Sequence, residues 1–130
     1  MATIKPAMNQ VEVHPFLQQD ELISFCKSEE IMVTAYAPLG SFDRPDIMKM
    51  KDEPILIKNP LVLAIAEKHN ITPAGVLLAW GLSRGICLIP KSTTPSRIEE
   101  NLTSTNITLD QDDIEKAEEY IYSEIEWIDL

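Results

Sequence analysis

Cysteine is scarce in this sequence, since only Cys26 and Cys87 occur among its 130 residues. Cys26 lies in a segment whose apolar residues have helical spacing, and Cys87 lies in a short apolar run typical of a buried strand. Two cysteines placed in this way indicate reduced thiols and argue against a disulfide framework or a metal centre. We therefore expect both thiols to fill the core.

Positive charge and long apolar runs are also in short supply. The 11 lysines and arginines face 21 aspartates and glutamates, which gives a formal net charge of -10 and a pI near 4.5. Such a surface repels nucleic acids and anionic membranes, so we exclude both as partners. No apolar run approaches the roughly 20 residues of a membrane helix, and residues 1–6 contain no signal-peptide core. We expect a cytoplasmic protein.

Hydrophobic residues, with the aromatics included, make up 45% of the chain. This content is enough for one ordinary core. The hydrophobic residues alternate between strand-like and helical patterns. The predicted strands are 7–13, 31–37 and 86–89, and the predicted helices are 20–29, 59–69, 72–84, 95–102 and a last one from Asp110. Asp20 is the predicted cap of the first helix, and the segment from Gly40 to Lys58 is predicted to be a long irregular loop.

This alternation is typical of a parallel α/β protein. Three parallel strands that are apolar on both faces would leave two open sheet edges and too few helices to cover them. We therefore interpret residues 1–130 as one partial domain of a larger structure.

The stretch from Ile89 to Asn101 is typical of a strand that leads into an anion-binding loop and a helix start. Thr94 and Pro95 have the order of an N-cap hydroxyl and a first helical proline. The free amides of a helix start, with Lys91 and Arg97 beside them, would suit a phosphate. An ordinary capped helix with two solvated cations is the alternative interpretation.

Other titratable groups do not predict a metal site. Glu12 and His14 share a strand face but have no third ligand. The acidic residues between Asp110 and Glu119 lack the spacing and glycine of a calcium loop and are typical of a capped, solvated helix face. His69, at a helix end, is expected to interact only with the helix dipole.

Three motifs together resemble the aldo-keto reductase family in order and spacing, and most closely its aldose reductase branch. They are residues 9–15 (NQVEVHP), 35–41 (AYAPLGS) and 89–92 (IPKS), the last followed by Arg97 and by residues 100–101 (EN). Residues 40–45 (GSFDRP) also have a counterpart in that branch. The resemblance covers nearly all of the chain.

The resemblance implies a partial (β/α)8 TIM barrel that corresponds to strands six to eight, their helices and the extra C-terminal helix. Complete barrels need about 250 residues. Family members reduce aldehydes and ketones to alcohols with NADPH. Their catalytic tyrosine, lysine, aspartate and histidine lie in the first half of the barrel, so this chain is expected to contain no catalytic residue and to be inactive alone.

The same resemblance implies a nicotinamide site in which the ring stacks on Tyr36 and the carboxamide binds Gln10. Leu39, Ser41 and Asp43 resemble the loop that closes over the pyrophosphate, with Asp43 acting as a latch to basic residues. Each residue has an alternative interpretation. Tyr36 could be an ordinary core tyrosine, and Asp43 could be a solvated loop aspartate. Gln10 could be a structural amide with a polar partner that offsets the cost of burial. Ala37 departs from the serine of many members, and the serine–asparagine pair that accompanies the glutamine is missing.

At the other end of NADPH, the resemblance implies contacts with the 2′-phosphate and the adenine. The residues for the 2′-phosphate are Lys91, Ser92, Thr93 and Arg97, and those for the adenine edge are Glu100 and Asn101. The guanidinium of Arg97 would also stack on the adenine ring.

Two hypotheses follow from the sequence. In the first, the chain is the C-terminal, NADPH-binding portion of a carbonyl reductase and binds a carbonyl substrate only with the missing half. In the second, it is a non-catalytic nucleotide-binding or interaction module that hides its sheet edges by self-association or with a complementary half-barrel.

Overall fold

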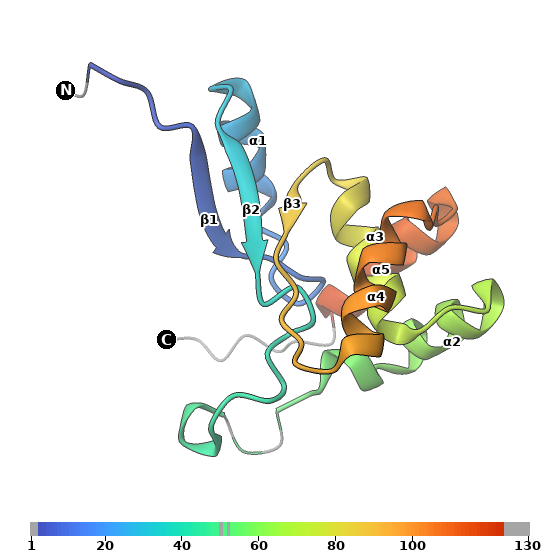
Figure 1. Ribbon diagram of the computed structural model, residues 1–130. Coiled ribbons are helices and arrows are strands. Elements are labelled where there is room, and N and C mark those ends of the chain that lie inside the picture. The colour runs from blue at the N-terminus through green and yellow to red at the C-terminus, as the bar shows by residue number, and fades with distance from the viewer. Residues whose placement is uncertain (1–2, 50, 52, 124–130) are drawn as a thin grey trace.

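The computed structural model describes residues 3–49, 51 and 53–123, with the backbone alone for 120–123. Its strands form one parallel sheet in the order β1 (Met8–Glu12), β2 (Met32–Tyr36) and β3 (Cys87–Leu88) (Figure 1). The predicted parallel α/β class is confirmed, although each strand is shorter than predicted. Glu12 pairs with Tyr36, so these two strands end together at one edge of the sheet.

Five helices accompany the sheet in the described part of the chain, together with three 3-10 turns. No described helix is long and apolar enough to cross a membrane. The helices are α1 (Asp20–Ser28), α2 (Pro60–His69), α3 (Pro73–Ser83), α4 (Pro95–Thr103) and α5 (Gln111–Ser123), and the turns are η1 (Asp46–Met48), η2 (Leu56–Lys58) and η3 (Ser104–Asn106). Two of these turns interrupt the segment that was predicted to be irregular.

The helix starts follow the local chemistry of the sequence in most cases. The Asn59 side chain accepts hydrogen bonds from the amides of Leu61 and Val62 at 2.9 and 3.4 Å, directly before Pro60. Thr72 Oγ1 accepts from the Gly75 amide at 3.1 Å. Each side chain satisfies amides that have no partner within the helix.

Two predicted caps are wrong. The residue before α1 is Gln19, in a left-handed conformation, and Asp20 is already the first helical residue. Thr94 does precede Pro95 at the start of α4, but its hydroxyl makes no capping bond. Instead, Ser92 Oγ accepts a hydrogen bond from the Thr94 amide at 3.1 Å. The side chain that closes the turn before the helix is therefore that of Ser92 and not that of Thr94.

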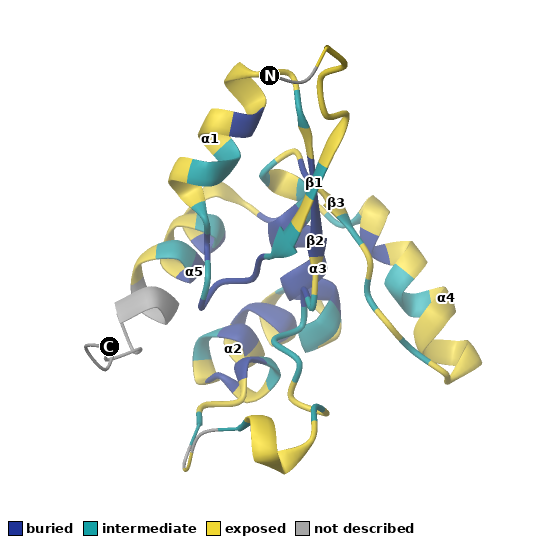
Figure 2. Ribbon diagram, turned by 90° about the vertical axis from the view of Figure 1, so that its left-hand side faces the viewer, coloured by how far each residue is buried: buried dark blue, intermediate teal, exposed yellow. Residues whose placement is uncertain are grey.

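The core lies where β2 meets α2 and α3. The three central residues of β2 are buried, whereas both outer strands are partly exposed (Figure 2). Cys26 is buried as predicted, but the prediction for Cys87 is wrong because this thiol is exposed. Leu88 packs on Gly81 of α3, and adjacent strand residues point to opposite faces. Cys87 therefore points to the face that α3 does not cover.

Arg84 follows α3 and joins several helices. Its guanidinium lies 4.8 Å from the Trp80 ring centroid and pairs with Asp20 of α1. It also donates to Glu118 of α5 at 3.1 Å and to the Gln18 carbonyl at 2.9 Å. With only 11% of its side chain exposed, Arg84 is a charge held inside the protein by acceptors from separate segments.

The two kinds of helix start give a direct test of capping. We expect Asn59→Ala to lower the free energy of unfolding by about 1 to 2 kcal/mol, because two amides lose their acceptor. Thr94→Ala is the matched control and should change it by less than about 0.5 kcal/mol, since no capping bond is lost. Urea denaturation followed by circular dichroism measures both values, and equal losses in the two variants would contradict the assignment.

Candidate functional site

A cavity of about 600 Å³ lies beyond the carboxyl ends of the strands. Its walls come from the segments after β2 and after β3, which descend side by side in Figure 1, together with α4 and the start of α3. Ten of the eleven predicted cofactor residues line this cavity, namely Tyr36, Leu39, Ser41, Asp43, Lys91, Ser92, Thr93, Arg97, Glu100 and Asn101.

The wall after β2 depends on an unusual backbone. Tyr36 is the last residue of the strand and is 43% exposed, so it is not the buried core tyrosine of the alternative interpretation. Ala37, Gly40 and Ser41 then follow with φ of 49°, 82° and 47°. A left-handed residue other than glycine costs about 1 to 2 kcal/mol. Such strain is often found at functional sites, where the surrounding structure holds it.

An ion pair joins the two walls. Lys91 Nζ lies 3.4 Å from Asp43 Oδ2, with 73% and 59% of the two side chains exposed. The pairing with a basic residue that the resemblance implies for Asp43 is therefore present in the structure. Solvent and salt screen such an exposed pair, so it contributes little free energy and can open easily.

The wall after β3 is a short polar turn that enters α4. Ser92, Thr93 and Thr94 present hydroxyls in this turn, and Lys91 and Arg97 supply positive charge at the same end of the cavity. Pro95 is the first helical residue and has no amide hydrogen, and the amides of Arg97 and Ile98 donate to the Thr94 carbonyl. This end of the cavity therefore has the cations and donors that an anionic group requires.

Gln10 is the predicted residue that does not line the cavity. It lies within β1, opposite Thr34, and its side chain is exposed. The alternative interpretation of Gln10 as a buried structural amide that needs a polar partner is therefore wrong, because the side chain is not buried. β1 is an outer strand here, and outer strands leave more of their side chains open to solvent.

The model of the aldo/keto reductase family matches residues 1–121 of the chain. The chain belongs to this family. Known aldo/keto reductases include one from Synechocystis sp. that is 47% identical over 116 residues, which cover 89% of this chain and 36% of that protein. Aldo-keto reductase family 1 member A1 is 46% identical in Bos taurus over 118 residues and 45% identical in Homo sapiens over 116. These alignments cover 91% and 89% of this chain, and 36% and 35% of the relatives.

The chain thus spans about a third of the length of these aldo/keto reductases.

Three cavity residues that sequence reasoning missed are Thr72, Pro73 and Ala74, at the start of α3. The predicted helix 72–84 begins at these residues. In a parallel α/β protein a helix that leads into a strand starts at the carboxyl edge of the sheet, where barrel enzymes bind their ligands. This topological rule could have assigned Thr72–Ala74 to the cavity.

Glu12 and His14, which belong to the first aldo/keto reductase motif, form a pair outside the residues that line the cavity. His14 Nε2 lies 3.1 Å from Glu12 Oε1. Burial lowers the pKa of His14, and the hydrogen bond to Glu12 opposes this effect only in part. The pair links the end of β1 to the residues that follow it, which is a structural role.

A polar cluster at the junction of α2 and α5 corrects two predictions. His69 Nε2 lies 2.6 Å from Asp113 Oδ2, so His69 does more than interact with a helix dipole. Asp113 is buried and does not belong to a solvated face. Lys68 Nζ lies 2.6 Å from Asp110 and 2.9 Å from Asp113. The three groups His69, Asp110 and Asp113 lie close enough to bind a metal ion, but the Lys68 ammonium already pairs with both carboxylates.

This cluster predicts that the stability of the folded chain depends on pH in the acidic range. The Lys68 ammonium and then the Asp113 amide stabilise the Asp110 carboxylate and lower its pKa from 3.8 to about 2. The folded state therefore gains stability from ionised Asp110 above about pH 4, and loses it as the pH falls from 4 towards 2. We expect the difference in melting temperature between the wild-type chain and Asp110→Asn to shrink over this range.

The amide of Asp110→Asn keeps an oxygen that can cap α5 and removes only the titrating group. Thermal melts between pH 2 and pH 7 measure the difference. Asp112→Asn is the control, because the Asp112 carboxylate pairs with the exposed Lys116 on one helix. A difference for Asp110→Asn that stays constant with pH would contradict the assignment.

Proposed function

We propose that the chain is the C-terminal, NADPH-binding portion of an aldo-keto reductase that reduces aldehydes or ketones to alcohols. The observation that carries this proposal is the common cavity of ten residues that the family resemblance selects. They come from two segments about 50 residues apart, and five of them supply charge or stacking surface, namely Tyr36, Asp43, Lys91, Arg97 and Glu100.

The chemistry of the cavity walls fits NADPH. One end carries two cations and three hydroxyls, which suit the 2′-phosphate, and the other end carries the exposed ring of Tyr36, which suits the nicotinamide. Ser41 and Asp43 belong to the wall after β2, and the pyrophosphate would pass beside them. NADH has no 2′-phosphate for Lys91 and Arg97 to contact, so the site should prefer NADPH.

When bound, NADPH supplies a hydride to the carbonyl carbon of the substrate. The residues of this chain hold and orient it: Tyr36 would support one face of the nicotinamide ring, and Gln10 would fix the carboxamide. Protonation of the developing alkoxide requires an acid. The resemblance assigns that acid to a tyrosine outside this chain, so we expect negligible turnover from the chain alone.

We further propose that residues 1–130 form a single partial domain of a (β/α)8 barrel. In this assignment β1, β2 and β3 correspond to barrel strands six to eight, and α5 to the helix that follows the barrel. The partial exposure of β1 and β3 supports the proposal, since a closed barrel would give each of them a second neighbour. The carbonyl substrate would then bind only with the remaining strands.

Cofactor preference tests the proposed function. We expect the wild-type chain to bind NADPH on the order of tenfold or more tightly than NADH, and Lys91→Met with Arg97→Met to abolish this preference, because charge-assisted contacts to the 2′-phosphate are lost. Lys27→Met with Lys116→Met removes the same charge outside the cavity and should keep it. Tryptophan fluorescence titration gives the constants. Equal affinity for NADPH and NADH in the wild-type chain would refute the proposal.

A second candidate function is a self-associating, non-catalytic module. It is favoured by the open edge of β1, where Met8 and the neighbouring Met32 of β2 are exposed. Native mass spectrometry with NADPH tests it, and we expect species larger than a monomer at micromolar concentration. A defined oligomer that carries NADPH would support a binding module. A monodisperse monomer with a cooperative melt would contradict self-association.

A further inference from the structure

The guanidinium of Arg44 holds together three separate parts of the loop that follows β2. Its Nε donates to the Met48 carbonyl at 3.0 Å and its Nη1 to the Ser41 carbonyl at 3.4 Å. Its Nη2 lies 2.5 Å from each carboxylate oxygen of Glu53. We call these contacts the loop clamp.

The loop clamp is better shielded than the ion pair that joins the loop to the opposite wall. The side chains of Arg44 and Glu53 are 29% and 24% exposed, although most of the described residues between them are exposed. The Asp43–Lys91 pair is longer and far more exposed. Shielded, charge-assisted bonds from a planar guanidinium are the stronger interaction. The shape of the loop should therefore depend on the clamp and not on the Asp43–Lys91 pair.

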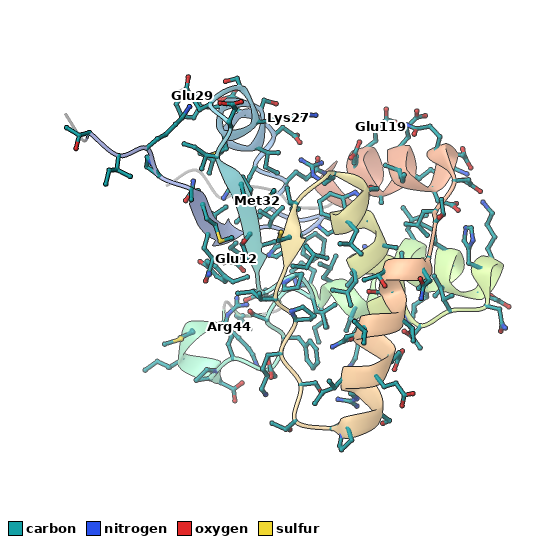
Figure 3. All side chains as sticks on the ribbon, turned by 45° about the horizontal axis from the view of Figure 1, so that its top comes forward. Glu12, Lys27, Glu29, Met32, Arg44 and Glu119 are labelled. Atoms are coloured by element: carbon teal, nitrogen blue, oxygen red, sulfur yellow. The ribbon has the colours of Figure 1, made fainter. Side chains whose placement is uncertain are left out.

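The clamp also supports the strained entrance of the loop. Ser41 has a left-handed backbone, and its carbonyl accepts from both the Arg44 amide, at 3.1 Å, and Arg44 Nη1. Such a conformation persists only where the surroundings hold it. Arg44 itself is not among the residues that line the cavity, whereas Ser41 and Asp43 are. Figure 3 shows Arg44 on the same side of the molecule as Glu12, near the end of β1.

We propose that Arg44 is a positioning residue for the cofactor: its clamp gives the loop a fixed shape that presents Ser41 and Asp43 to the cavity. When the Asp43–Lys91 pair opens, a clamped loop moves as one unit and closes again in the same shape. This inference rests on the proposed function, since the ligand that the loop would cover is the pyrophosphate of NADPH.

The test compares Arg44→Gln with Lys49→Gln, which removes the same charge from the same loop but only an exposed pair with Asp46. The two ligands are NADPH and adenosine 2′-phosphate, which lacks the pyrophosphate and would contact only the wall after β3. We expect Arg44→Gln to weaken NADPH binding about tenfold, the loss of roughly one charge-assisted bond. Binding of adenosine 2′-phosphate should stay within about twofold in both variants, and Lys49→Gln should resemble the wild-type chain.

Hydrogen exchange of the ligand-free chain gives a second readout. The amides of residue 44 and of Met48 and Lys49 donate within the loop, and their exchange should become more than about tenfold faster in Arg44→Gln. The charge swap Arg44→Glu with Glu53→Arg restores opposite charges but removes the donor to the Ser41 and Met48 carbonyls. We expect it to bind NADPH as weakly as Arg44→Gln.

Several results would overturn the proposal. These are unchanged exchange in Arg44→Gln, an equal loss for both ligands, which would mean that Arg44 supports the whole fold, and full recovery in the charge swap, which would mean that an ion pair suffices. If the wild-type chain binds adenosine 2′-phosphate but not NADPH, the proposed function fails. The exchange comparison then still decides whether Arg44 shapes the loop.

Discussion

The placement of the helices depends on the paired charge of Arg84. Apolar packing of α3 against the sheet is not directional, but the guanidinium over Trp80 reaches acceptors in α1, in α5 and in the segment before α1 at fixed positions. Loss of any one acceptor would leave part of a buried charge unpaired, which costs more than an ordinary contact. Because the start of α3 lines the cavity, the same interaction fixes one wall of the site.

The order of strands and helices could be predicted from the sequence because each change of hydrophobic period coincides with a local signal. Asn59 before Pro60 and Thr72 before Pro73 locate two helix starts within a residue. The strands were predicted too long because apolar residues continue beyond the residues that are paired in the sheet, as Ile86 and Ile89 do around β3. The burial of Cys87 was wrong since a sequence does not reveal which face of a strand remains uncovered.

The cavity could be predicted to a large extent because its residues lie in short runs at strand ends, where parallel strands bring distant loops together. What the sequence could not reveal depends on tertiary geometry. The exposure of Gln10 follows from the outer position of β1, and the contact of His69 with Asp113 joins residues that are 44 positions apart in the chain. The contacts of Arg44 arise only when its loop turns back on itself.

The cavity is assembled from segments that meet only when β2 and β3 are paired, so an unfolded chain has no such binding site. Any ligand that bridges the two walls therefore shifts the folding equilibrium by mass action. At a free concentration 100 times its dissociation constant, such a ligand adds about 2.7 kcal/mol to the stability of the folded state. For a three-stranded sheet with open edges, that increment would be a sizeable share of the total stability, so occupancy of the cavity and persistence of the fold are linked quantities.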